Sequence, residues 1–249
     1  MWVAAVQLNS TPEVEDNVAR ARAFIQEAAG RGAQLVALPE HFAYLGPDEG
    51  LAAVAQPDRG PLVSGFRELA EELKIFLLLG SFPELAEPGT RPYNTSLLLG
   101  PEGQVLARYR KMHLFDVDLP GVPSYRESRF TQPGGEVVVA PLPGTPGTAG
   151  LSVCYDLRFP ELFRAMMARG GGPLPAARGL HRQHRAGPLG DPGAGPGHRE
   201  PGLRGGAGPV RPPRPGTAQL RPLPHRGPLG AGPGPGPGRG RGDLCPAGL

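Results

Sequence analysis

The sequence predicts an α/β fold, in which a mainly parallel or mixed sheet is covered by helices. Two observations lead to this prediction. Short apolar runs of strand length alternate with segments of helical period over the first 169 residues, a pattern typical of helix-covered sheets. The chain has 249 residues, which is enough for one such domain with a sizeable core.

The first 60 residues contain two predicted strands around one helix. Residues 2–8 and 35–38 are apolar runs of strand length. Between them, Thr11-Pro12-Glu13 is a helix start, and apolar residues then recur at helical spacing until Gly30 and Gly32 end the helix.

The next 50 residues predict a helix, a strand and a hairpin. Residues 61–74 have an apolar helical face, and residues 75–79 form a strand that Gly80 and Ser81 close. Residues 93–99 and 104–110 are two strands joined by a Gly-Pro-Glu-Gly turn, a pattern typical of a β-hairpin.

Two further short strands are predicted at residues 137–140 and 151–153, and the second leads directly to Cys154. Pro160 and Glu161 then open an apolar, helix-like segment at residues 162–167. A cysteine between a strand and a helix lies near helix N–H groups, which favour the nucleophilic thiolate. The alternative for a single cysteine is a buried structural residue.

Bulk composition excludes several function classes. A net charge of +3 gives no general case for nucleic-acid or membrane binding. Two cysteines, Cys154 and Cys245, make no disulfide framework and suit a reducing compartment. The N-terminus lacks the basic region of a signal peptide, and no apolar run has the length of a membrane span. We therefore expect a cytoplasmic protein.

The composition changes at about residue 170. The chain has 39 Gly and 33 Pro residues, and from Gly170 onward roughly half of all residues are one or the other. This segment has no Phe, Tyr, Trp, Ile or Met, so it cannot bury enough apolar area to offset its ordering entropy. Residues 170–249 are predicted to be a disordered tail.

Three polar residues lie at the ends of predicted strands. Glu40, Lys111 and Cys154 each follow a strand, so a sheet can gather them at one edge. A cysteine nucleophile needs a base within hydrogen-bond reach, and Glu40 suits that role. A tetrahedral intermediate needs a cation or N–H donors at its oxygen, and Lys111 suits that one. Taken singly, Glu40 and Lys111 can also be solvated strand-end residues, and Cys154 can be a buried structural cysteine.

Other groups of residues give weaker indications of a functional site. The spacing of His113, Asp116 and Asp118 matches no specific metal motif, so no metal is expected. No glycine-rich phosphate loop follows a strand in the first 169 residues, so no nucleotide cofactor is expected either. A polar loop at residues 125–134 holds a second carboxylate, Glu127.

Three segments of the sequence resemble the signature segments of the nitrilase (carbon–nitrogen hydrolase) superfamily. They are LPEHF around Glu40, YRKMHLFD around Lys111 and VCYDLRFPE around Cys154, in the family's order. The resemblance covers residues 1–169. It implies Glu40 as general base, Lys111 as oxyanion stabiliser, Cys154 as nucleophile and Glu127 as an assisting carboxylate. It also implies an αββα sandwich, paired into homodimers or larger homo-oligomers, with no cofactor.

Within the superfamily, the segments around Lys111 and Cys154 look most like the omega-amidase and deaminated-glutathione amidase branch. Such enzymes hydrolyse a terminal amide of a small carboxylated substrate through a thioester and release ammonia. Arg158 or Arg129 is a candidate for holding the substrate carboxylate, and Tyr155 is a second candidate for substrate contact. A surface role is equally open for either arginine.

The strands and helix expected after the cysteine helix are absent from the written sequence. Residues 187–200 can be encoded by a nucleotide sequence that, when it is read one base out of register, encodes AHWEILVRARAIE. With the same shift of the reading frame, residues 179–185 can give AFTANTG and residues 220–233 can give YGHSLIVDPWGRV. The three shifted peptides look like segments that the family carries after its cysteine, and they come in the right order. We infer a frameshift between about Ala168 and Gly179. The written chain would lack the last part of its sheet, so we expect it to be poorly folded and inactive.

Two alternatives remain open at this stage. The chain can belong to another branch of the superfamily, such as a nitrilase or an N-carbamoyl amide hydrolase. It can also be a non-catalytic domain whose Arg/Gly/Pro segment binds nucleic acid. That segment lacks lysine and aromatic residues, which disfavours the second alternative.

Overall fold

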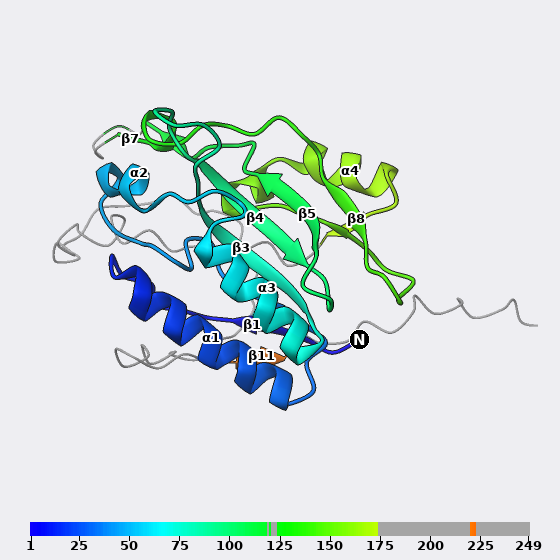
Figure 1. Cartoon of the computed structure of the whole chain (residues 1–249). Coiled ribbons are helices and arrows are strands. Elements are labelled where there is room, and N and C mark those ends of the chain that lie inside the picture. The colour runs from blue at the N-terminus through cyan, green and yellow to red at the C-terminus, as the bar shows by residue number, and fades with distance from the viewer. Residues whose placement is uncertain (119, 121–123, 174–219, 223–249) are drawn as a thin grey trace, which may run out of the picture.

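The computed structural model describes residues 1–118, 120, 124–173 and 220–222 (Figure 1). Its main element is a six-stranded sheet with the order β11-β1-β2-β3-β4-β5. The strands of this sheet are β1 (Val3–Val6), β2 (Leu35–Ala37), β3 (Phe76–Glu84), β4 (Tyr93–Leu99), β5 (Val105–Arg110) and β11 (Leu220–Pro222).

Strand directions place several strand ends at one edge of the six-stranded sheet. β1, β2 and β3 are parallel to one another, and β4 is antiparallel to both β3 and β5. β5 therefore runs in the same direction as β2 and β3. The carboxyl ends of β2 and β5 and the start of β4 consequently lie at the same edge.

The remaining elements form a second sheet, a small ribbon and several helices. The second sheet has the order β10-β9-β8 and the ribbon pairs β6 with β7. The strands are β6 (Asp116–Val117), β7 (Tyr125–Arg126), β8 (Val139–Pro141), β9 (Thr148–Gly150) and β10 (Gly172–Pro173). The α-helices are α1 (Val14–Gly30), α2 (Leu51–Val54), α3 (Pro61–Leu73) and α4 (Pro160–Ala168), and the 3-10 turns are η1 (Asp48–Gly50), η2 (Glu127–Arg129) and η3 (Cys154–Arg158).

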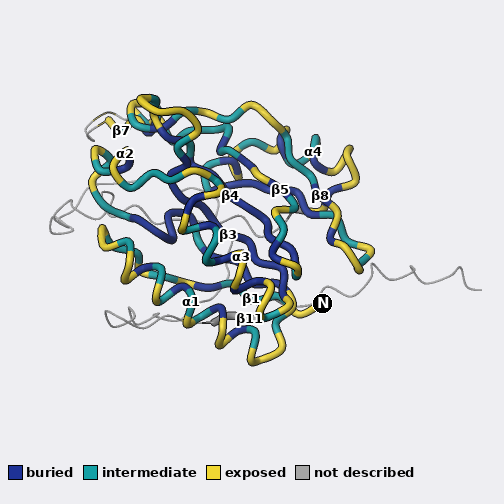
Figure 2. The backbone as a smooth tube through the Cα atoms, in the orientation of Figure 1, coloured by how far each residue is buried: buried dark blue, intermediate teal, exposed yellow. Residues whose placement is uncertain are grey.

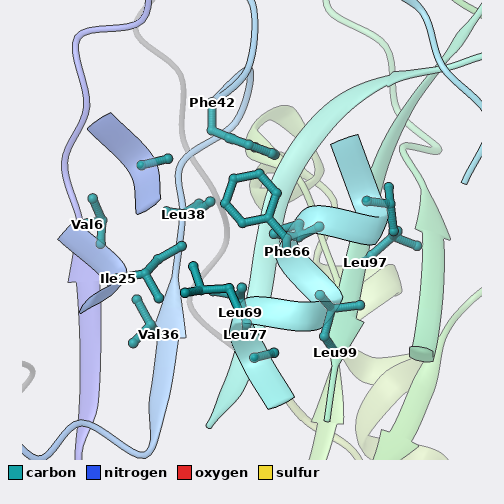
Figure 3. Packing of buried hydrophobic residues seen from close by; sticks show 14 of the residues in the cluster. Val6, Ile25, Val36, Leu38, Phe42, Phe66, Leu69, Leu77, Leu97 and Leu99 are labelled. Carbon is teal, nitrogen blue, oxygen red and sulfur yellow. The ribbon is translucent and has the colours of Figure 1, made fainter. Parts of the chain in front are cut away.

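One hydrophobic core lies between the six-stranded sheet and helices α1 and α3 (Figure 3). Ile25 of α1, Leu69 of α3 and Leu77 of β3 are completely buried there. Phe42 and Phe66 meet edge to face, with ring centroids 5.3 Å apart. This core covers one face of the sheet.

A second core lies between the two sheets. Leu78 and Leu98 of the six-stranded sheet, Ala149 and Leu151 of the β9 segment and Met166 of α4 belong to one buried cluster. Helix α4 contacts β9 and β10. The layers are therefore helix, sheet, sheet, helix, which confirms the predicted α/β sandwich, and β3 and β4 are buried along almost their whole length (Figure 2).

Two predicted element boundaries were wrong. β3 does not end at Leu79 but continues to Glu84, because a β-bulge between Leu79 and Phe82 absorbs the predicted stop. The strand before the cysteine ends at Gly150, and Leu151 to Val153 form an extended link rather than a strand.

Several other predicted elements are confirmed, and most of the predicted tail lies outside the residues that the structure describes. The helices starting at Val14 and Pro61 and the hairpin of β4 and β5 are confirmed. Of the predicted tail at 170–249, only residues 170–173 and 220–222 are described, and there the prediction of disorder was wrong for strands β10 and β11. The rest of the predicted tail lies outside the described residues. Among the described helices, none is both long and apolar enough for a membrane crossing.

Candidate active site

The structure brings Glu40, Lys111, Glu127 and Cys154 together where the two sheets meet. Glu40 follows β2 and Lys111 follows β5, at the shared edge of the six-stranded sheet. Cys154 opens η3 beyond the second sheet, and Glu127 opens η2 after the small ribbon. The site is thus built from both sheets, not from the edge of one sheet as predicted.

Glu40 is held by close contact with the bulge of β3. The Ser81 amide donates to the Pro39 carbonyl over 3.3 Å, and the His41 amide donates to Ser81 Oγ over 3.0 Å. A Cβ atom at Gly80 would lie 2.1 Å from the Pro39 oxygen, so only glycine permits this approach. Gly80, which was predicted to end the strand, therefore allows β3 to pack closely against the Glu40 loop.

Lys111 lies between two carboxylates. Its Nζ atom donates to Glu40 Oε1 over 3.0 Å and to Glu127 Oε2 over 2.9 Å. Glu40, Lys111 and Glu127 are only 4%, 2% and 6% exposed. Buried side chains stay charged when they are paired with an opposite charge, and here the Lys111 ammonium pairs with both carboxylates. The cluster carries one net negative charge when all three groups are ionised.

Glu127 is fixed by backbone contacts. The Phe115 amide donates to Glu127 Oε2 over 2.6 Å, and the Glu127 amide donates to the Phe115 carbonyl over 3.2 Å. These reciprocal bonds tie η2 to the segment that follows Lys111.

Asn94 is a site residue that the sequence analysis missed. Its Nδ2 atom donates to Glu40 Oε1 over 3.1 Å and to Glu127 Oε1 over 3.4 Å, and its backbone carbonyl accepts from the Lys111 amide over 2.9 Å. The amide side chain therefore bridges the two carboxylates from the side of β4. The hairpin register pairs Thr95 with Arg110, which places Asn94 opposite Lys111, and that register was the available signal.

Cys154 carries a protonated thiol beside Glu40. The thiol hydrogen-bonds the Glu40 carboxylate. Burial, and next the negative charge of Glu40, raise the pKa of Cys154 to about 12 although Lys111 opposes the shift. Helix α4 begins only at Pro160, so the prediction that helix N–H groups favour the thiolate was wrong.

The electrostatics of the other two groups favour their charged forms. Burial acts to raise the pKa of Glu40, but the positive charges of His41 and Lys111 outweigh it and lower that pKa to about 2. Burial likewise acts to lower the pKa of Lys111, but Glu40 and Glu127 outweigh it and raise that pKa. At neutral pH the site holds a carboxylate, an ammonium and a thiol.

The predicted substrate-contact residues lie around this cluster. Tyr155 is half-buried and meets the ring of Phe115 edge to face, with centroids 5.0 Å apart. Arg158 is exposed and forms no hydrogen bond or ion pair within the described residues. Arg129 is also exposed and lies over the ring of Phe130. The structure therefore leaves both arginines without a demonstrated link to the cluster.

The three residues weighed as metal ligands have other partners. His113 Nδ1 lies 2.7 Å from Asp156 Oδ1, and Asp116 accepts from Ser128 Oγ over 2.7 Å. Asp118 Oδ2 lies 4.0 Å from Arg126 Nη2. Within the described ranges, no group of three or more His, Cys, Asp or Glu residues is arranged to hold a metal ion.

Comparison with known proteins places this geometry in a family. Residues 2–188 match the family model described as "Carbon-nitrogen hydrolase". The chain belongs to the carbon–nitrogen hydrolase family. Its computed structure is similar to the crystal structure of Nit3 from Saccharomyces cerevisiae, described as a member of branch 10 of the nitrilase superfamily, with a TM-score of 0.60 and 30% identity over 69% of this chain and 61% of that one.

Two curated relatives of this carbon–nitrogen hydrolase are amidases by name. Deaminated glutathione amidase of Mus musculus is 42% identical over 165 residues, which cover 64% of this chain and 50% of the relative. Omega-amidase NIT2 of Homo sapiens is 39% identical over 168 residues, which cover 68% of this chain and 59% of the relative. The matched part of the chain thus spans between half and two thirds of these relatives.

Proposed function

We propose that this site hydrolyses a non-peptide amide of a small carboxylated molecule through a thioester on Cys154. The observation that carries the proposal is the buried cluster in which Lys111 bonds both Glu40 and Glu127 beside the Cys154 thiol. A nucleophile, a carboxylate base and a fixed cation are the three groups that acyl transfer from an amide requires.

In the first half of the reaction, Cys154 sulfur attacks the amide carbonyl carbon. The thiol proton passes to Glu40 as the C–S bond forms, because a pKa of about 12 keeps the thiol protonated until then. The carbonyl π electrons move to oxygen, where the Lys111 ammonium stabilises the developing charge. Glu40 then protonates the nitrogen, the C–N bond breaks and ammonia leaves.

In the second half, water attacks the thioester carbonyl. Glu40 accepts a proton from that water, the C–S bond breaks and the sulfur recovers its proton from Glu40. The balance is one amide and one water converted to one carboxylic acid and one ammonia. Glu127 and Asn94 position the reacting groups, since both bond Glu40 or Lys111.

The names of two relatives support the proposed substrate class. Two of the curated matches act, by name, on deaminated glutathione or as omega-amidases. The test uses protein expressed from the gene after its reading frame has been verified. It measures ammonia release from 2-oxoglutaramate, deaminated glutathione, a nitrile and an N-carbamoyl amine, with Cys154→Ala as the control. Turnover of either amide, lost in the variant, supports the proposal. Turnover of the nitrile or the carbamoyl compound alone assigns the chain to another branch.

We further propose that the gene product is frameshifted after about residue 168. The composition change at Gly170 and the three shifted segments support this proposal. We expect the written chain to lack amidase activity, and a purified, monodisperse 249-residue product that hydrolyses amides would overturn that expectation. Sequencing the gene across codons 165 to 185 tests the frame itself.

The remaining proposals concern the cellular location, the oligomeric state and the binding partners of the protein. We propose a cytoplasmic enzyme, because the two cysteines suit a reducing compartment. We propose that the in-frame protein forms homodimers or larger homo-oligomers and binds neither nucleic acid nor membrane. Sedimentation measures the oligomeric state of the frame-verified protein, which is the protein expressed from the gene after its reading frame has been checked by sequencing. Salt-dependent RNA binding would argue for the nucleic-acid alternative.

A further inference from the structure

The Asp156 carboxylate accepts hydrogen bonds from three separate segments. It is completely buried. Its Oδ2 atom accepts from the Val153 amide over 2.8 Å and from the Tyr109 hydroxyl over 2.6 Å. Its Oδ1 atom accepts from the His113 amide over 3.2 Å and lies 2.7 Å from His113 Nδ1. Within the described part of the chain, no lysine or arginine pairs with this carboxylate, so these donors satisfy it.

The partners of Asp156 lie beside the proposed catalytic residues. Tyr109 and His113 are two residues before and two residues after Lys111. Val153 directly precedes Cys154, and Asp156 is two residues after it. One buried side chain therefore links the segment that carries the nucleophile to the segment that carries the cation.

Cys154 needs such support because its backbone is strained. Its φ angle is 46°, in the left-handed region that a residue with a side chain rarely adopts. A conformation of this kind is unfavourable and persists only where the surroundings hold it. Asp156 closes the turn around Cys154 from both sides, because its carboxylate accepts from the Val153 amide and its own amide donates to the Val153 carbonyl over 3.1 Å.

Aromatic packing holds the same turn from outside. The His113 imidazole stacks on the Phe159 ring, with centroids 3.7 Å apart and planes inclined by 9°. Tyr155 meets Phe159 edge to face, with centroids 5.5 Å apart. His113 is thus fixed both by the carboxylate and by the end of η3.

We propose that Asp156 is a positioning residue that holds Cys154 in its left-handed conformation and fixes the cysteine turn against the Lys111 segment. The inference rests on the nucleophilic role proposed for Cys154. Asp156 acts through position, because the charged groups that act on the thiol are Glu40, Lys111 and Glu127. Without Asp156 the turn relaxes, the thiol leaves Glu40, and its pKa returns toward the ordinary value of about 8.5.

The experiment is the pH dependence of iodoacetamide alkylation in the protein expressed from the gene after its reading frame has been verified, because the written chain is expected to fold poorly. Peptide mapping by mass spectrometry measures Cys154 separately from every other cysteine. In the parent chain the Cys154 rate rises throughout the range from pH 7 to about pH 11, because burial and Glu40 hold the pKa high. In Asp156→Asn the rate levels off near pH 9 and, at pH 9, exceeds the parent rate at least tenfold.

A matched variant separates positioning from loss of stability. Leu69→Ala removes a completely buried side chain on the opposite face of the sheet and destabilises the chain without touching the cysteine turn. At a temperature where circular dichroism shows all variants folded, Leu69→Ala keeps the parent profile. If Asp156→Asn does not fold, Tyr109→Phe removes one donor to Asp156, together with the acceptor of the Met112 amide, and shifts the profile in the same direction.

The outcomes are decisive for Asp156. A folded Asp156→Asn or Tyr109→Phe chain with the parent profile overturns the positioning role. A parent chain whose Cys154 rate levels off near pH 9 overturns the geometry on which the role is built. Alkylation requires no amide turnover, so a chain without amidase activity leaves this test intact and refutes only the proposed function.

Discussion

Lys111 donates a hydrogen bond to Glu40 over 3.0 Å, and both side chains are almost completely buried. A second carboxylate, Glu127, bonds the same ammonium. Removing one partner from a buried ion pair leaves an uncompensated charge, which is far more costly than the pair itself is stabilising. The cluster is therefore both a candidate for catalysis and a sensitive point of the fold.

Lys111→Met keeps the length of the side chain and removes its charge. We expect the free energy of unfolding at pH 7 to fall by about 3–5 kcal/mol, because two buried carboxylates lose their cation. Urea unfolding of the frame-verified protein measures this change, because the written chain is expected to fold poorly. Arg31→Met is the control, since that arginine pairs with Glu27 on the exposed surface and its loss costs about 1 kcal/mol or less. Equal losses in the two variants would contradict the buried pairing.

The pH dependence of stability follows from the pKa of Glu40. That pKa is about 2 in the folded chain and 4.5 ordinarily, so Glu40 stabilises the fold above pH 4.5. This contribution is lost as the pH falls from about 4.5 to 2, and the free energy of unfolding decreases across that window. Glu40→Gln should flatten the decrease there. An unchanged slope in the variant would show that Glu40 does not have its lowered pKa.

Glu40→Gln also changes the nucleophile. The charge of Glu40 is one of the causes that raise the pKa of Cys154, so the variant should have a lower Cys154 pKa and alkylate faster at pH 8. Glu84→Gln is the matched control, because Glu84 is another buried carboxylate whose partners are Arg110 and Thr95. Amide turnover should nonetheless fall at least a hundredfold in Glu40→Gln, because the base is gone. A slower alkylation would contradict the electrostatic account.

Gly80→Ala tests the support beneath Glu40. The added Cβ atom would lie 2.1 Å from the Pro39 oxygen and 2.2 Å from the Leu38 oxygen, so backbone must move. We expect a loss of about 1–3 kcal/mol in stability, the usual cost of overpacking, and a lower Tm. Gly135→Ala, where nothing lies within 4 Å of the added atom, is the control. Equal Tm values for the two variants would show that the Glu40 loop does not pack on β3.

The first half of the fold was predictable because its patterns are local. The apolar spacing after Val14 and after Pro61 fixes two helices, and the turn at residues 100–103 fixes the hairpin. Burial of one helical face or one strand face leaves a period in the sequence that needs no knowledge of the partner. The bulge in β3 was missed because a glycine and a serine mark strand ends and bulges alike.

The sequence indicated which candidate residues lie together in the structure, but it did not indicate the electrostatics of that cluster. Glu40, Lys111 and Cys154 stand at strand ends or in motifs, so the sequence pointed to them. The state of the Cys154 thiol depends on how deeply it is buried and on its distance from Glu40, and neither leaves a local pattern. Asn94 and Asp156 were missed for a related reason, since each acts on residues that are distant in sequence.

The most direct test of the central claim is acid-quenched mass spectrometry of the frame-verified protein during turnover of a hydrolysed amide. The account predicts an adduct of the acyl mass on the peptide that contains Cys154, formed together with one ammonia, absent from Cys154→Ser and slowed in Lys111→Met. Ammonia release with no adduct on Cys154, or release that persists in Cys154→Ser, would contradict a thioester mechanism at this site.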